Sequence, residues 1–116
     1  MIRKKKFKVP LYGQHFNVVF YDDDNEFDQM FEKEGIPLLV KDHEGAVCSK
    51  NGLFYVFFAT DKKGYPTPGL IAHEAKHLVN EIFIEIGYNL DRENDEPEAY
   101  LLMWVVNRIH EFLNEK

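Results

Sequence analysis

The stretch Ala72–Leu78 contains the pattern His-Glu-x-x-His, whose residue types and spacing suit metal chemistry. Side chains four positions apart share one face of a helix, so His73 and His77 can hold one metal ion together. Glu74 directly follows the first histidine, where its carboxylate can act on a water molecule at the metal. A catalytic zinc needs three protein ligands and one open position. The pattern therefore requires a third ligand from elsewhere in the chain.

The histidine pair falls in a predicted helix that has two distinct faces. Thr67 is expected to cap this helix at its start, and Gly87 is expected to end it. An apolar stripe is predicted to pack on a sheet, and it consists of Ile71, Ala75, Leu78, Val79, Ile82 and Ile86. The opposite side carries the two histidines with Asn80, Glu81 and Ile84, so the metal pair is predicted to point away from the sheet.

The third ligand is expected at the start of the last predicted helix, which runs from about Asp95 to Asn114. An antiparallel return of the chain brings this start back toward the far end of the histidine-bearing helix, and the chain must bend further to reach His73. Glu98 is the preferred ligand because it lies one turn inside the helix, where its direction is fixed. Glu96 is the second candidate and Asp95 the third, but capping of the helix N-terminus is the favoured role for both.

Glu81 and His43 are two further candidates for the third ligand. Glu81 lies on the same helix as His73 but about 12 Å along its axis, at about 1.5 Å per residue, which is too far to close the site. His43 falls in a turn between strands and stays open as a candidate.

Composition and charge exclude several classes of protein. The 116 residues suit one domain spanning 1–116, and the single Cys48 permits no internal disulfide and fits a reducing compartment. The net charge of −6 argues against nucleic-acid binding. The basic segment Arg3–Lys8 is expected to be a solvated tail beside the first strand, and no apolar run is long enough to span a membrane. We therefore expect a cytoplasmic protein.

Alternating strand and helix patterns predict an α+β fold. Strands are expected at Phe7–Leu11, His15–Tyr21, Ile36–Val40, Ala46–Lys50 and Leu53–Ala59, where Pro10 reduces the first to an edge or irregular segment. A helix is expected from Asp23 or Asp24 to about Glu34, and Gly35 is expected to end it. The prediction is a minimal domain with a small mixed sheet of about four strands, packed with an N-terminal helix, the histidine-bearing helix and a buried C-terminal helix.

The histidine motif on a helix, followed by Glu98-Ala99 at the start of a later helix, resembles gluzincin-type zincin metallopeptidases. The pattern is most similar to ImmA/IrrE-like peptidases and compact bacterial and phage zincins. The resemblance implies zinc bound by His73, His77 and Glu98, with Glu74 as general base. It also implies a protein or peptide substrate lying extended along an edge strand, here Ala46–Lys50.

The chain departs from the ImmA/IrrE-like pattern at two positions. Lys76 is charged where those peptidases usually carry an uncharged residue, and Tyr100 follows Ala99 where they usually carry asparagine.

Two functions follow from these residues. The first is a zinc-dependent peptidase, which Glu74 favours because a purely structural metal site has no need of a base. The alternative is a non-catalytic zinc-binding module that binds a partner, which the short chain favours. A side chain that stabilises the oxyanion formed during hydrolysis would assist a peptidase. The candidates, none of them preferred, are Tyr65, Tyr88, Tyr100 and His110. A nucleobase deaminase is excluded because it needs two further cysteines.

Overall fold

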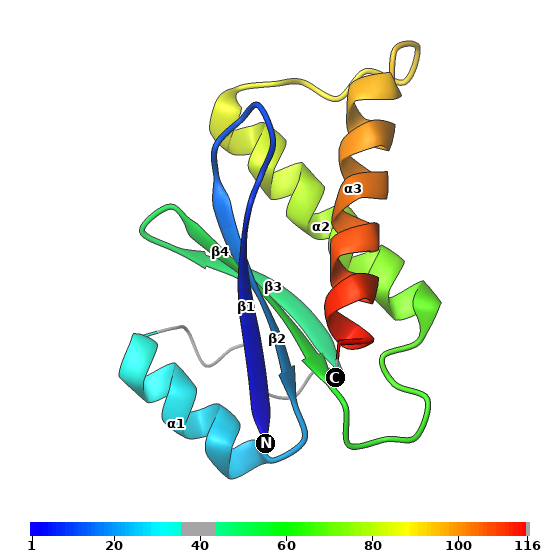
Figure 1. Cartoon of the computed structure of the whole chain (residues 1–116). Helices are drawn as coiled ribbons and strands as arrows, with labels where there is room; N and C mark the ends of the chain where they lie inside the picture. The colour runs from blue at the N-terminus through cyan, green and yellow to red at the C-terminus, as the bar shows by residue number, and fades with distance from the viewer. Residues whose placement is uncertain (36–43, 116) are drawn as a thin grey trace.

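A four-stranded mixed sheet lies at the centre of the computed structural model, which describes residues 1–35 and 44–115 (Figure 1). The strands are β1 (Ile2–Lys8), β2 (His15–Tyr21), β3 (Gly45–Lys50) and β4 (Leu53–Ala59). Their order is β1-β2-β4-β3, with β2 and β4 parallel and the two outer pairs antiparallel. The helices are α1 (Asp24–Glu34), α2 (Pro68–Ile86) and α3 (Glu96–Leu113). The predicted α+β class is therefore confirmed.

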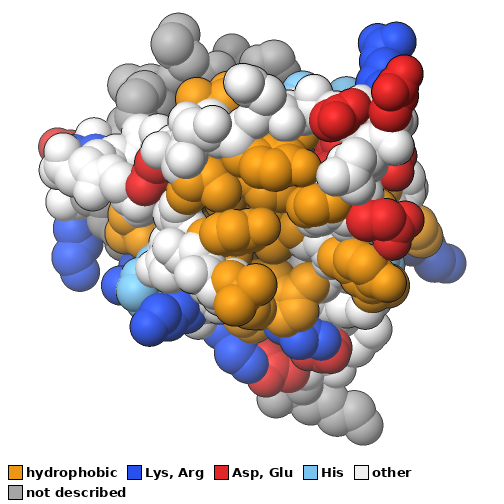
Figure 2. All heavy atoms as spheres, turned by 90° about the horizontal axis from the view of Figure 1, so that it is seen from above, with side chains coloured by type: hydrophobic (Ala, Val, Ile, Leu, Met, Phe, Trp, Pro, Cys, Tyr) orange, Lys and Arg blue, Asp and Glu red, His pale blue; other side chains and the backbone are white. Residues whose placement is uncertain are grey.

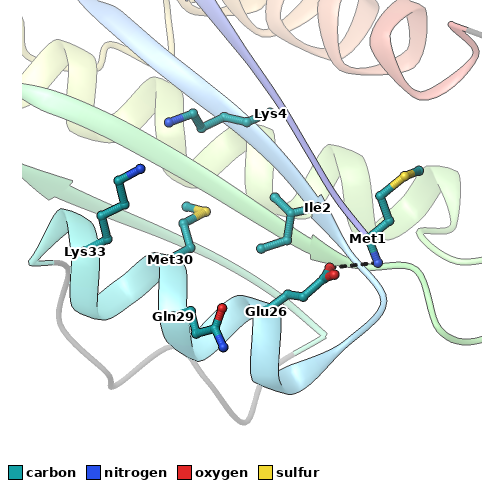
Figure 3. A pocket seen from close by; sticks show the side chains of 7 residues that line it. All are labelled: Met1, Ile2, Lys4, Glu26, Gln29, Met30 and Lys33. Carbon is teal, nitrogen blue, oxygen red and sulfur yellow. Dashed lines mark ion pairs between the residues drawn. The ribbon is translucent and has the colours of Figure 1, made fainter.

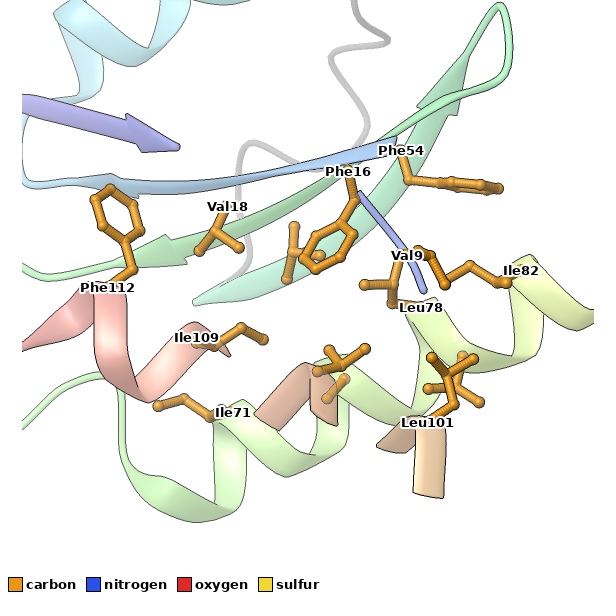
Figure 4. Close-up of a cluster of buried hydrophobic side chains, with 14 of the residues drawn as sticks. Val9, Phe16, Val18, Phe54, Ile71, Leu78, Ile82, Leu101, Ile109 and Phe112 are labelled. Atoms are coloured by element: carbon orange, nitrogen blue, oxygen red, sulfur yellow. The ribbon is translucent and has the colours of Figure 1, made fainter. Parts of the chain in front are cut away.

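The two central strands are buried on both faces because helices cover both sides of the sheet. Phe16 and Val18 of β2 point toward α2 and α3, where they meet Ile71, Leu78 and Ile109 (Figure 4). On the other face, a second cluster joins the sheet to Phe27 of α1. The prediction that Leu53–Ala59 is covered on both sides is confirmed, since its five central residues are all buried.

Helix α2 has the capping residues that its sequence predicts. The Thr67 hydroxyl accepts a hydrogen bond from the backbone N–H of Leu70 at 3.1 Å, and Gly87 ends the helix with a left-handed φ of 75°. Five residues of the predicted apolar stripe are fully buried. The sixth, Ile86, is 37 % exposed and was wrongly included, because the chain leaves the sheet at this end and Phe83 is buried instead.

The first strand was predicted in the wrong place. It covers Ile2–Lys8, so the basic segment is a strand rather than a tail. An outer strand tolerates lysines because it has solvent along one side, and Arg3 finds partners by donating hydrogen bonds to carbonyl oxygens at the end of α3. Pro10 and Leu11 lie in the turn that follows, which the Val9 N–H closes by donating to the Gln14 carbonyl at 2.7 Å.

Helix α1 begins and ends where the sequence predicts. Asp23 accepts a hydrogen bond from the Asn25 N–H at 2.8 Å at the start of α1, and Gly35 follows the helix with φ of 67°, as predicted. The expected strand Ile36–Val40 lies outside the described residues. In the part of the chain that is described, none of the helices has the length and apolar character to cross a membrane.

Candidate metal centre

His73 and His77 lie one turn apart on the exposed side of α2, as the helical spacing predicts. Their Nε2 atoms are 3.2 Å apart. Two ligands of one tetrahedral zinc, each about 2.0–2.1 Å from the ion, lie about 3.3 Å apart. The separation of the two nitrogens therefore fits two ligands on one ion without a change in the helix.

Glu74 differs from both histidines because it is buried. Glu74 is only 5 % exposed, and its Oε2 atom lies 4.0 Å from Nε2 of His73. One ligand atom from each of His73, Glu74 and His77 lies within 4.8 Å of the others. The carboxylate thus sits beside the histidine pair but toward the sheet, where it can accept a proton from a water molecule in front of the pair.

Gly45, at the start of β3, makes room for Glu74. A Cβ atom built at Gly45 would lie 3.0 Å from Cγ and 3.3 Å from Oε2 of Glu74. These distances are shorter than ordinary contacts, so any side chain at position 45 would press on the carboxylate. The sequence predicts a turn at His43 just before this strand, but nothing in the local pattern reveals which helix the strand will meet.

A shallow groove of about 590 Å³ opens beside Glu74 and His73. Its lining includes Gly45 from β3, Leu70 from α2 and Tyr65 from the loop before α2. Of the oxyanion-helper candidates, Tyr65 is the one that lines this groove, whereas Tyr100 lines a different hollow. The groove therefore lies beside the buried carboxylate at the point where the outer strand β3 begins.

One wall of the groove is charged. Glu44 pairs with Lys62, and this carboxylate raises the pKa of the Lys62 ammonium through a hydrogen bond. The pair links the start of β3 to the loop that leads into α2.

Glu98 lies on the first turn of α3 and faces α2, but its carboxylate pairs with the ammonium group of Lys76. Lys76 also donates to Oδ1 of Asn80 at 2.8 Å. The Glu98 carboxylate is therefore held by a cation in this structure, and that cation belongs to the residue that precedes His77 in the sequence. Its predicted role as third ligand stays a prediction.

The structure also places two of the alternative third ligands, Asp95 and Glu96. Asp95 and Glu96 are exposed at the start of α3, and the Asp95 side chain makes no capping hydrogen bond. His43 lies outside the described residues. Within residues 1–35 and 44–115, the group of at least three potential ligands that lies close together is His73, Glu74 and His77.

Neither Cys48 nor the hollow beside the N-terminus has the chemistry of a reactive site. Burial raises the pKa of the Cys48 thiol to about 11, so it stays protonated at neutral pH. A hollow of about 510 Å³ lies between β1 and α1, where the N-terminal ammonium group pairs with Glu26 at 2.8 Å (Figure 3). Its lining includes Lys4, Lys33, Met30 and the Glu26 carboxylate, which is already paired with the ammonium group. The described residues that line this hollow include no histidine and no cysteine.

Comparison with models of known protein families, with curated proteins and with solved structures finds no match for this chain. The zincin resemblance therefore stays a prediction that rests on His73, Glu74, His77 and Glu98 themselves.

Proposed function

We propose that this chain is a zinc-dependent metallopeptidase that hydrolyses peptide bonds of a protein substrate. The observation that carries the proposal is the burial of Glu74 between an exposed histidine pair and an outer strand. A structural metal site needs no carboxylate at this place. A peptidase needs one there, because a base must stand next to the water that attacks the substrate.

The residues divide into ligands and a base. His73 and His77 would hold zinc together with Glu98, provided that the Glu98 carboxylate leaves Lys76. Bound zinc would polarise the substrate carbonyl and lower the pKa of water. Glu74 would accept a proton from the attacking water and pass it to the leaving amine. Tyr65 is a candidate donor to the oxyanion because it lines the same groove.

An extended peptide is the proposed form of the substrate. In the described sheet β3 is an outer strand, and it begins at Gly45 against the base. Its outward backbone groups can pair with a peptide as an added strand, which would align a scissile bond with Glu74. The single Cys48, which is a free thiol, supports our further proposal of a cytoplasmic location.

A non-catalytic zinc-binding module is the second candidate, and one observation favours it. The carboxylate of Glu98, the proposed third ligand, is paired with Lys76, which leaves the two histidines as the ligands in place. A module that binds a partner could use such a site without turnover.

Metal content tests the site. We expect about one zinc per chain by mass spectrometry of the untagged protein, lost in His77→Ala and in Glu98→Ala. His15→Ala is the matched control, because His15 is an exposed histidine on β2. Zinc lost in His77→Ala but kept in Glu98→Ala would move the third ligand elsewhere. A wild-type protein that binds no zinc after reconstitution would refute the metal site.

Activity separates the two candidate functions. The zinc-loaded protein is incubated with a proteome-derived peptide mixture, and new peptide ends are identified by mass spectrometry. Glu74→Gln should keep zinc and fold while cleavage falls by a factor of about 100 or more. Cleavage that survives this substitution would refute the mechanism, and zinc binding without any cleavage would favour the module.

A further inference from the structure

An apolar patch covers the end of the molecule where the hairpin between β1 and β2 meets the start of α3. Both segments lie at the top of Figure 1, and Figure 2 looks down on them and shows one continuous hydrophobic area. A hollow of about 380 Å³ within it is lined by Pro10, Leu11, Tyr12, Pro97, Tyr100, Leu101 and Trp104. None of these residues lines the groove at Glu74, so the patch is a separate surface.

Leu11 is the least expected residue of this patch. Its side chain is 99 % exposed, and its backbone has φ of 67°, a conformation that is costly for residues other than glycine, asparagine or aspartate. A fully exposed leucine gains no packing energy within the chain that would offset this cost. A strained conformation that displays an apolar side chain at a hairpin tip indicates a contact made with another molecule.

The aromatic residues of the patch point to the same use. Tyr100 is 63 % exposed on α3, and Trp104 lies one turn further along the same helix. Tryptophan and tyrosine are enriched among residues that dominate binding energy at protein interfaces. Exposed apolar patches of this kind are uncommon on monomeric proteins unless they bind something.

Charge is arranged with opposite signs on the two sides of the patch. Lys8 and His15 are neighbours across β1 and β2 at the hairpin side, and both are exposed. Asp95 and Glu96 are exposed at the other side, directly before Pro97. In Figure 2, basic groups and a histidine stand at the lower left of the hydrophobic area and acidic groups stand at its right, while groups of both signs stand along its lower margin. None of these four side chains forms an ion pair with another described residue.

We infer that the patch is the interface through which two copies of this chain pair face to face about a two-fold axis. A two-fold axis lying between the positive and negative margins sets the Lys8 side of one copy against the Glu96 side of its partner. The apolar centre then meets its own counterpart, and Leu11 inserts near Tyr100 or Trp104 of the partner subunit. One surface thus supplies both halves of the complementarity, which favours a second copy over an unrelated partner.

Sedimentation velocity on the full chain tests this inference, which does not depend on the proposed function. From about 1 to about 200 µM protein, we expect a concentration-dependent shift from monomer to dimer. Leu11→Asn should raise the dissociation constant by about 30-fold or more. Asparagine tolerates the left-handed backbone, so this variant should stay folded by circular dichroism. Ile84→Asn is the matched control, since Ile84 is exposed on α2 outside the patch and its replacement should leave the dimer unchanged.

Charge reversal tests the proposed orientation. Lys8→Glu and Glu96→Lys should each raise the dissociation constant by about tenfold, because like charges then face each other. The double variant on one chain should restore most of the affinity, and added salt should weaken the wild-type dimer. A monomer at all concentrations, including in the presence of zinc, would overturn the inference and leave the patch to another partner. A dimer whose dissociation constant is unchanged by Leu11→Asn would overturn the inference as well.

Discussion

Gly45 is the residue at which β3 comes closest to the proposed base. We predict that Gly45→Ala lowers the rate of peptide cleavage by about tenfold or more, because the added methyl group displaces the Glu74 carboxylate. Zinc content should stay near the wild-type value, since the two histidines face away from β3. Ser49→Ala is the control, because Ser49 is exposed on the same strand and does not line the groove. Equal cleavage rates for the two variants would show that the contact at Gly45 does not position Glu74.

Lys76 is the charged residue between the two histidines, and it pairs with a carboxylate that is only 18 % exposed. We predict that Lys76→Met lowers the free energy of unfolding of the metal-free protein by about 1–2 kcal/mol, because Glu98 loses its counter-ion. Zinc should then raise the melting temperature more in this variant than in wild type, since the metal no longer competes with an ammonium group for Glu98. Thermal unfolding with and without zinc measures both effects.

The exposed Lys63 supplies the control for that substitution. Lys63→Met should change neither the stability nor the response to zinc. If zinc raises the melting temperature of Lys76→Met and of wild type equally, Lys76 does not compete with the metal for Glu98, even if the variant is less stable.

At the scale of elements, the helices were predictable and the first strand was not. Capping residues and apolar spacing are local signals, and Thr67, Gly87 and Gly35 act as those signals predict. The segment Ile2–Lys8 lacks an apolar alternation, and it becomes a strand because β2 offers a free edge and α3 ends beside Arg3. That pairing is a tertiary contact, which no local pattern contains.

The same division applies to the candidate site. His73, Glu74 and His77 come together because one helix carries them, so their proximity follows from spacing alone. The contacts of Glu74 with Gly45 and of Lys76 with Glu98 each join two different elements. Their geometry depends on how the chain returns between elements, which the residues at the site do not encode.

Strand β3 also controls the reactivity of the single cysteine. Burial raises the pKa of Cys48 from 9.0 to about 11, so we predict that iodoacetamide alkylates it about 100-fold more slowly in the folded protein than in urea at pH 8. The rate should increase as the pH rises toward 11. Because the raised pKa favours the neutral thiol in the folded state, this stabilisation is complete below pH 9 and is lost between pH 9 and 11. Equal rates in folded and unfolded protein would contradict the burial of the thiol.

At the scale of the whole molecule, the two ends of the described chain meet. Arg3 on β1 donates hydrogen bonds from Nη2 to the carbonyl oxygens of Phe112 at 2.6 Å and of Glu115 at 3.1 Å. Its guanidinium carbon also lies 4.9 Å from the centre of the Phe112 ring. A guanidinium group suits this place because the last carbonyl groups of a helix have no partners within the helix and attract positive charge.

We predict that Arg3→Met lowers the free energy of unfolding by about 1–2 kcal/mol, because partly buried carbonyl groups at the end of α3 lose their donors while the aliphatic packing is largely kept. Arg3→Lys should recover less than half of this loss, since one ammonium group cannot reproduce the planar arrangement of donors over the ring. Lys6→Met is the control, because Lys6 is exposed on the same strand. Urea unfolding followed by tryptophan fluorescence measures all three, since Trp104 on α3 contacts Phe16 of the sheet. If Arg3→Met and Lys6→Met unfold at the same urea concentration, the contact of Arg3 with the end of α3 contributes nothing to stability.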